Sequence, residues 1–218
     1  MQQIYLDNAA TTPVRPEVEE AMQPYFCEKY GNPSGIYKMA SECRQAVETV
    51  RKQIGETLKV SAEEIYFTSG GTESDNWAIK SIAQRLKEKG KHIITSKIEH
   101  HAVLNSCAYL ETQGFEVTYL DVDEWGCVRL DVLQRAIRKD TILISIMYAN
   151  NEVGTIQPID QIGKIAKEND IFFHTDAVQA YGQIPVDIKK ENIHLLSASA
   201  HKFNGPKGVG FLYIDKRV

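Results

Sequence analysis

The sequence has no apolar run that approaches the roughly 18 residues needed to cross a membrane, and its first residues lack the basic and apolar regions of a signal peptide. Positive charge is not in excess, because 25 Lys and Arg oppose 29 Asp and Glu, for a net charge of −4. Binding to nucleic acid or to anionic membranes needs clustered positive charge. We therefore expect a cytoplasmic protein with neither a nucleic-acid nor a membrane partner.

Cysteine is scarce and is not arranged as a metal or disulfide framework. The four cysteines are Cys27, Cys43, Cys107 and Cys127, and no two of them form a C-x-x-C pair. Without a secretion signal, this spacing favours free thiols. Cys43 falls on the apolar face of a helical pattern, so we expect it to be buried as a small hydrophobic residue. None of the four lies in an obvious setting for a nucleophile.

Repeats, low-complexity tracts and Pro/Ser-rich linkers are also missing, so the 218 residues show no internal domain boundary. Amphipathic spacing predicts one long helix over 36–54. Further helical stretches are expected over 15–29, 72–88, 99–113, 130–138 and 158–169. Short β-branched or aromatic runs predict strands over 65–68, 92–95, 116–120, 141–148, 171–175, 193–197 and 209–214. This alternation predicts an α/β fold with a mostly parallel sheet flanked by helices.

In such a sheet ligands bind at the carboxyl ends of the strands. Gly70, Gly71 and Thr72 follow the first strand and open a helix, where free N–H groups favour phosphate. An ordinary glycine turn, with Thr72 as the helix cap, is the alternative. The segment matches neither a Walker loop nor the dinucleotide-binding glycine pattern. His100 and His101 begin the next helix, where one ring could stack on a ligand or simply face solvent.

Other polar side chains follow the later strands. Asn151 could bond a ligand oxygen or form a turn. Asp176 follows an apolar strand, so it needs a positive partner such as a protonated heterocyclic nitrogen, unless it caps a helix or binds metal. Lys202 could form a Schiff base if its pKa is lowered, and Ser199 and His201 supply donors close by. The combination of anion site, stacking ring, buried aspartate and lysine describes a pyridoxal phosphate (PLP) site.

Seven motifs resemble those of the cysteine desulfurases, which belong to the class V aminotransferase group of fold-type-I PLP enzymes. They are Tyr5–Pro13, Gly31–Ser34, Thr68–Asn76, Glu99–His100, Asn150–Gly154, His174–Gln179 and Ser199–Lys202. They occur in the family's order over essentially the whole chain. The Asn-Asn-Glu form resembles the branch that serves iron–sulfur cluster assembly and tRNA thiolation. The resemblance implies a three-layer large domain over residues 15–218, preceded by a segment, 1–14, that associates with a small domain.

The resemblance also implies roles for individual residues. Lys202 would hold PLP and move the α-proton of the substrate, and His100 would stack on the ring, which makes these two the expected catalytic residues. Asp176 would pair with the ring nitrogen. Gln179 would contact the phenolic oxygen, and Asn151 would lie near that oxygen and the substrate carboxylate. The phosphate would be held by Gly71, Thr72, Ser199 and His201.

Family members convert L-cysteine to L-alanine, pass the sulfur to an acceptor or scaffold protein, and act as homodimers. Their persulfide-forming cysteine and their substrate-binding arginine correspond to positions beyond residue 218, so we expect this chain alone to lack sulfur transfer. Gly35-Ile36-Tyr37 also departs from the usual Ser and His of the family. Three alternatives stay open: another class V enzyme, such as a selenocysteine lyase or an aminotransferase; a folded fragment without catalysis; and, least favoured, a metal domain using His100, His101, His174 and Asp176.

Overall fold

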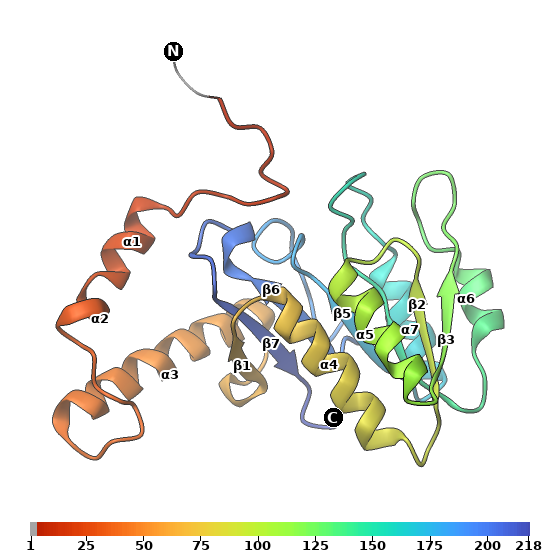
Figure 1. Ribbon diagram of the computed structural model, residues 1–218, viewed down its shortest axis with the longest axis horizontal. Coiled ribbons are helices and arrows are strands. Elements are labelled where there is room, and N and C mark those ends of the chain that lie inside the picture. The colour runs from red at the N-terminus through yellow and green to blue at the C-terminus, as the bar shows by residue number, and fades with distance from the viewer. Residues whose placement is uncertain (1–3) are drawn as a thin grey trace.

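The predicted strands form one seven-stranded sheet in the computed structural model, which describes residues 4–218 (Figure 1). In chain order they are β1 (Ile65–Thr68), β2 (His92–Ser96), β3 (Glu116–Leu120), β4 (Thr141–Ser145), β5 (Phe172–Asp176), β6 (Leu195–Ser199) and β7 (Gly210–Ile214). Their order across the sheet is β1-β7-β6-β5-β4-β2-β3. Only β7 runs antiparallel to its neighbours, β1 and β6. The expected mostly parallel α/β sheet is confirmed.

Helices connect the strands and cover both faces of the sheet. They are α1 (Pro16–Met22), α2 (Pro24–Cys27), α3 (Lys38–Leu58), α4 (Gly71–Leu86), α5 (His101–Thr112), α6 (Leu130–Ala136) and α7 (Ile159–Glu168), with the short 3-10 helices η1 (Ala62–Glu64) and η2 (Ala200–Lys202). Over residues 4–218, no helix has both the length and the apolar character of a membrane span. Residues 1–3 of the expected N-terminal segment lie outside the described part of the chain.

The core lies on both sides of the sheet, because successive strand residues point to opposite faces. Ile93 and Leu143 pack with apolar residues of α4 and α5 on one face. Their chain neighbours Ile94 and Ile144 pack with apolar residues of α6 and α7 on the other. β2, β4 and β6 are buried along their whole length. Burying each such side chain contributes about 1.5–3 kcal/mol, which fixes the strand ends that carry the site.

The helix expected over residues 15–29 is divided into α1 and α2. Pro24 has no N–H to bond to the preceding turn, and its ring crowds the carbonyl four residues earlier. The first helix therefore ends at Met22. Together with α3, these two helices form an arm (residues 16–58) that projects away from the sheet in Figure 1.

The strand expected over residues 141–148 leaves the regular ladder at Ser145. Extended backbone nevertheless continues toward the carboxyl edge. The Ile146 N–H donates to the His174 carbonyl at 3.1 Å, and the Tyr148 N–H donates to the Asp176 carbonyl at 2.8 Å. These bonds hold the segment after β4 beside the end of β5.

Candidate active site

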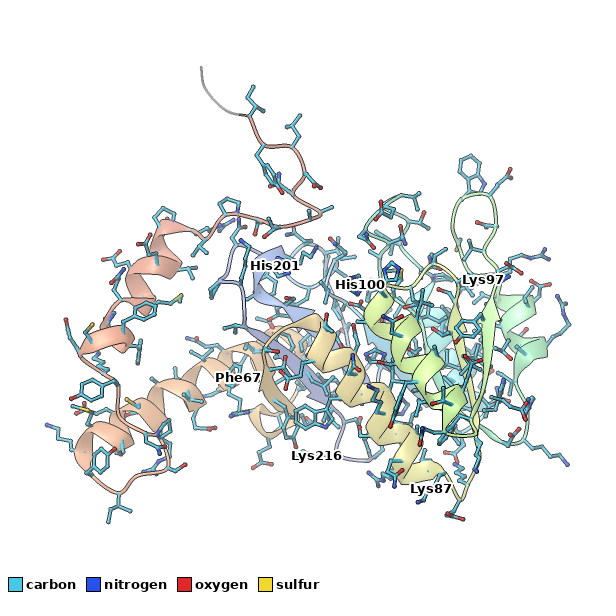
Figure 2. All side chains as sticks on the ribbon, viewed as in Figure 1. Phe67, Lys87, Lys97, His100, His201 and Lys216 are labelled. Atoms are coloured by element: carbon cyan, nitrogen blue, oxygen red, sulfur yellow. The ribbon has the colours of Figure 1, made fainter. Side chains whose placement is uncertain are left out.

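A cavity of about 480 Å³ opens at the carboxyl ends of β4, β5 and β6, beside the first turns of α4 and α5. All nine residues that the sequence predicts for the site line it: Gly71, Thr72, His100, Asn151, Asp176, Gln179, Ser199, His201 and Lys202. Figure 2 shows His100 and His201 at the same edge of the sheet. A cavity of this volume suits a small organic ligand.

The turn between β1 and α4 brings backbone close to the cavity. Gly70 has a φ of 148°, which residues with side chains rarely adopt. A Cβ on Gly71 would lie only 2.5 Å from Val178 Cγ2, so the turn packs tightly against the segment after β5. Since α4 begins at Gly71, its first N–H groups have no acceptor inside the helix. The turn can therefore hold an anion at the positive end of the helix dipole.

Thr72 does not cap α4, so the alternative reading of this turn is wrong in that respect. The helix begins at Gly71, one residue earlier than the sequence predicts, and Gly70 occupies the cap position without a side-chain bond. Thr72 instead lies in the first turn and lines the cavity. The Glu73 carboxylate accepts the Ser69 N–H at 2.5 Å, and this hydrogen bond lowers the pKa of Glu73.

Lys202 ends η2 and points its amine at the N-terminal segment. Its Nζ donates to the Ala9 carbonyl and, at 3.0 Å, to the Ala10 carbonyl. Gln179 Nε2 donates to the same Ala9 carbonyl at 2.9 Å. Burial lowers the pKa of Lys202, although the negative charges of Asp176 and Asp7 oppose that shift. Partial desolvation thus moves this amine toward its neutral, nucleophilic form.

Asp176 ends β5 and is 5% exposed. Its Oδ1 accepts the Val178 N–H at 2.9 Å. Burial raises the pKa of Asp176, while that hydrogen bond and the nearby His100 and Lys202 lower it. Within residues 4–218 no cationic group lies within salt-bridge distance of this carboxylate. A buried carboxylate of this kind favours a cationic or N–H partner in the cavity.

Ser199 and His201 add donors next to the glycine turn. Ser199 is buried at the end of β6, and a Cβ on Gly70 would lie 3.4 Å from its Oγ. The His201 Nδ1 lies 3.1 Å from Thr11 Oγ1. Burial lowers the pKa of His201, and the positive charges of Lys202 and Lys207 lower it further. Hydroxyl, imidazole and backbone N–H groups therefore converge on one anion-binding corner.

Of the two adjacent histidines, only His100 lines the cavity. Its Nδ1 accepts the Ala102 N–H at 3.1 Å and so caps α5, which leaves the ring proton on Nε2. The preceding residue, Glu99, is buried, and its Oε1 accepts the Met147 N–H at 3.0 Å. Burial raises the pKa of Glu99 to about 8. This anchor ties the start of α5 to the segment after β4.

Of the two asparagines after β4, one forms a turn and the other lines the cavity. Asn150 forms a turn, because its Oδ1 accepts the N–H groups of Glu152 and Val153 at 2.9 and 3.0 Å. Asn151 lines the cavity and donates to Glu152 Oε1 at 2.7 Å. The structure therefore places Asn150 in a turn and Asn151 at the cavity wall, and a bond from Asn151 to a ligand oxygen stays a prediction.

The alternative metal site is not assembled. His174 lies behind the cavity wall, with Nδ1 at 2.8 Å from Ser145 Oγ and Nε2 at 3.0 Å from Ser197 Oγ, so both nitrogens are engaged. In the part of the chain that the structure describes, no three His, Cys, Asp or Glu residues are grouped as metal ligands.

The cysteines lie away from the cavity, and none of the four contributes to its described wall. Cys43 is buried, as expected from its helical spacing, and its Sγ donates to the Lys29 carbonyl at 3.2 Å. Cys107 is fully buried, which raises the pKa of its thiol to about 12. Cys27 is exposed on the arm.

Several residues of the cavity wall were not predicted. Asp7, Ala9 and Ala10 reach it from the N-terminal segment, and no local pattern shows that contact. Asp75 also lines it. Its position, four residues after Gly71 on the same face of α4, is a signal that could have revealed it.

Comparison with known proteins agrees with this architecture. The profile of the family described as aminotransferase class-V matches residues 4–218. The cysteine desulfurase IscS of Methanosarcina thermophila is 65% identical over 215 residues, which cover 99% of this chain and 53% of that protein. The putative cysteine desulfurase IscS 1 of Bacillus subtilis is 54% identical over 218 residues, covering all of this chain and 58% of that protein.

Solved structures of other proteins also superpose on nearly all of this chain. A NifS-like protein superposes with a TM-score of 0.97 at 45% identity, over 100% of this chain and 60% of the other. A structure described as SspA in complex with cysteine gives a TM-score of 0.95 at 45% identity, over 97% and 61% of the two chains. The chain spans about half the length of the curated relatives it matches. The family profile extends over every residue that the structure describes, and the chain belongs to the class V aminotransferase family.

Proposed function

We propose that this chain is the PLP-binding part of a cysteine desulfurase, which moves the sulfur of L-cysteine to an acceptor thiol and leaves L-alanine. The observation that carries the proposal is the convergence of nine predicted site residues on one cavity. Relatives named cysteine desulfurase, and a similar protein solved in complex with cysteine, support the substrate. Iron–sulfur cluster assembly or tRNA thiolation, in the cytoplasm and as a homodimer, is the setting we propose.

The donor set fits PLP. The glycine turn with Ser199 and His201 provides neutral donors for a phosphate, because Gly71 brings the backbone of that turn to the cavity wall. Asp176 offers a buried carboxylate for a protonated ring nitrogen, and Lys202 offers an amine with a lowered pKa for the aldehyde carbon. When bound, PLP supplies an aromatic ring that withdraws electrons from the α-carbon of an amino acid.

We assign the remaining steps to side chains of this chain. The Lys202 Nζ accepts the proton of the substrate α-carbon and later returns it. His100 would stack on the ring face, with its orientation fixed by the α5 cap. Gln179 and Asn151 would orient the phenolic oxygen and the substrate carboxylate. The Asp176 charge would keep the ring nitrogen protonated.

We further assign residues 15–218 to the large domain and residues 1–14 to a segment that joins a small domain. The contact of the Ala9 and Ala10 carbonyls with Lys202 supports a position for that segment over the site. Because the four thiols lie outside the cavity wall, we propose that none of them accepts the substrate sulfur.

Cofactor attachment is tested by adding PLP to the purified chain, reducing with borohydride and mapping the modified peptide by mass spectrometry. We expect a pyridoxyl adduct on Lys202 that Lys202→Ala abolishes. Lys216→Ala is the matched control, since Lys216 is exposed and follows the end of β7 that lies away from the cavity (Figure 2). An unmodified, colourless wild-type protein would contradict the proposal.

Sulfur transfer is tested separately by adding L-cysteine and a reducing thiol to the PLP-loaded chain and measuring sulfide and alanine. We expect no sustained turnover from this chain alone, because no thiol lies at the cavity. Sustained release of both products would show that the assignment of the four cysteines is wrong.

A further inference from the structure

A second buried carboxyl group, Asp75, lines the cavity but has no place in the function proposed above. It is 1% exposed, and its Oδ1 has no hydrogen-bond partner among the described residues. α4 carries it one turn beyond Gly71, so it lies deeper in the site than the anion-binding turn. A buried polar group without a partner is costly, and such groups cluster where a ligand or a special charge state offsets that cost.

Asp75 lies against a layer of polar side chains beneath Asp176. His174 and Asp176 are two residues apart on β5, so they face the same side of the sheet. The Asp75 Oδ1 lies 3.5 Å from His174 Nε2. Two serines complete the layer: Ser197, in register with Asp176 on β6, and Ser145, in register with His174 on β4.

The charge states within this layer follow from burial. Burial raises the pKa of Asp75 well above its usual value, and the negative charges of Asp176 and Glu99 raise it further, while the nearby Ser197 hydroxyl opposes the shift. Burial lowers the pKa of His174 to about 3. Two carboxyl groups that share a dry site do not both ionise readily. Both pKa shifts favour the uncharged forms, a carboxylic acid beside a neutral imidazole.

We propose that Asp75 is a positioning residue for Asp176: as an uncharged group against His174, it completes the polar layer of β4, β5 and β6 side chains next to Asp176 and leaves the negative charge on Asp176. The inference rests on the proposed PLP site, in which Asp176 is the partner of the ring nitrogen. A neutral Asp75 leaves the negative charge of this layer on Asp176, where the ring nitrogen would meet it.

Two substitutions separate hydrogen bonding from charge. Asp75→Asn keeps the size, one donor and one acceptor, without a charge. Asp75→Leu keeps the approximate size and removes every polar atom. If Asp75 acts as a neutral group, Asp75→Asn behaves as the wild type does, and only Asp75→Leu disturbs the layer. If its charge mattered, both variants would be disturbed equally.

The first measurement needs no cofactor. The ring ¹⁵N shifts of His174 report its protonation and tautomer, and His174→Gln assigns its signals among the six histidines. In the cofactor-free protein we expect a neutral His174 from pH 5 to 8, with unchanged shifts in Asp75→Asn and altered shifts in Asp75→Leu. His174 shifts that are identical in all three proteins would overturn the contact, whatever becomes of the PLP proposal.

The second measurement is PLP affinity, from absorbance and fluorescence titration. We expect Asp75→Asn to bind within twofold of the wild type and Asp75→Leu to bind about tenfold more weakly, the factor expected when one buried polar contact is lost. Asp75→Ala repeats the test if the leucine variant does not fold. Equal weakening in Asp75→Asn would overturn the neutral state, and full affinity in the apolar variants would overturn the positioning role. Absence of PLP binding by the wild type would instead count against the proposed function.

Discussion

Replacing Gly71 with alanine tests the tight packing at the start of α4. The added Cβ would lie 2.5 Å from Val178 Cγ2, which is about 1 Å inside ordinary carbon contact. Overpacking of this kind costs about 1–3 kcal/mol. Without the clash, the same change would stabilise the protein by up to about 1 kcal/mol, because alanine favours a helix more than glycine does. The sign of the change in the free energy of unfolding therefore decides whether the contact is as close as described.

Val178→Ala is the matched partner, since it removes the atom that the new Cβ would meet. The double variant should be more stable than the sum of the two single changes predicts, by about 1–3 kcal/mol. Urea denaturation followed by circular dichroism measures each free energy. The Val178 N–H also donates to Asp176, so displacement in Gly71→Ala should weaken PLP binding, about tenfold for each 1.4 kcal/mol. Additive single changes, or a Gly71→Ala protein more stable than the wild type, would refute the reasoning.

Three other predictions concern buried groups. Burial raises the pKa of Glu99 to about 8. The stability that this group contributes is therefore complete below the ordinary carboxyl pKa of about 4, and it falls by up to about 1.4 kcal/mol per pH unit as the pH rises to 8. Glu99→Gln should flatten this slope in urea titrations across that range, and an unchanged slope would contradict the raised pKa. Alkylation of the native protein should modify the exposed Cys27 quickly and Cys107 only after unfolding, and equal rates would contradict the described burial. Ile144→Ala should cost about 2–5 kcal/mol in urea denaturation, because Ile144 is fully buried in the sheet core; a loss below 1 kcal/mol would be inconsistent with that packing.

Most of the fold could be predicted because the amino-acid composition of the strands shows that they are buried. Ile142-Leu143-Ile144 is apolar at every position, which indicates a strand covered on both faces, and β4 is buried along its length. Strand ends were less accurate. Composition alone could not show where the segment 141–148 leaves the ladder, because that end depends on single bonds from Ile146 and Tyr148 to β5.

The site was predictable where its residues follow strands, since parallel strands bring their carboxyl ends to one edge. Residues such as Asp176 and Lys202 belong to that class. The missed residues depend on contacts between distant parts of the chain. Ala9 meets Lys202 across 193 positions, and Asp75 faces the cavity only because the helix start at Gly71 fixes its rotation.

β1 and the N-terminal segment can form their final contacts only after residues much later in the chain have been synthesised. β1 pairs with β7, so Thr68 meets Gly210, and about 140 residues, roughly 7–28 s of synthesis, separate their emergence from a ribosome. The N-terminal segment depends on residues that are made even later relative to it, because the Thr12 and Arg15 N–H groups donate to the carbonyls of His201 and Asn204. Until β7 is made, β1 therefore lacks the strand that it pairs with among the described residues. An unpaired strand can pair with other chains, so we expect aggregation to be most probable before β7 is synthesised.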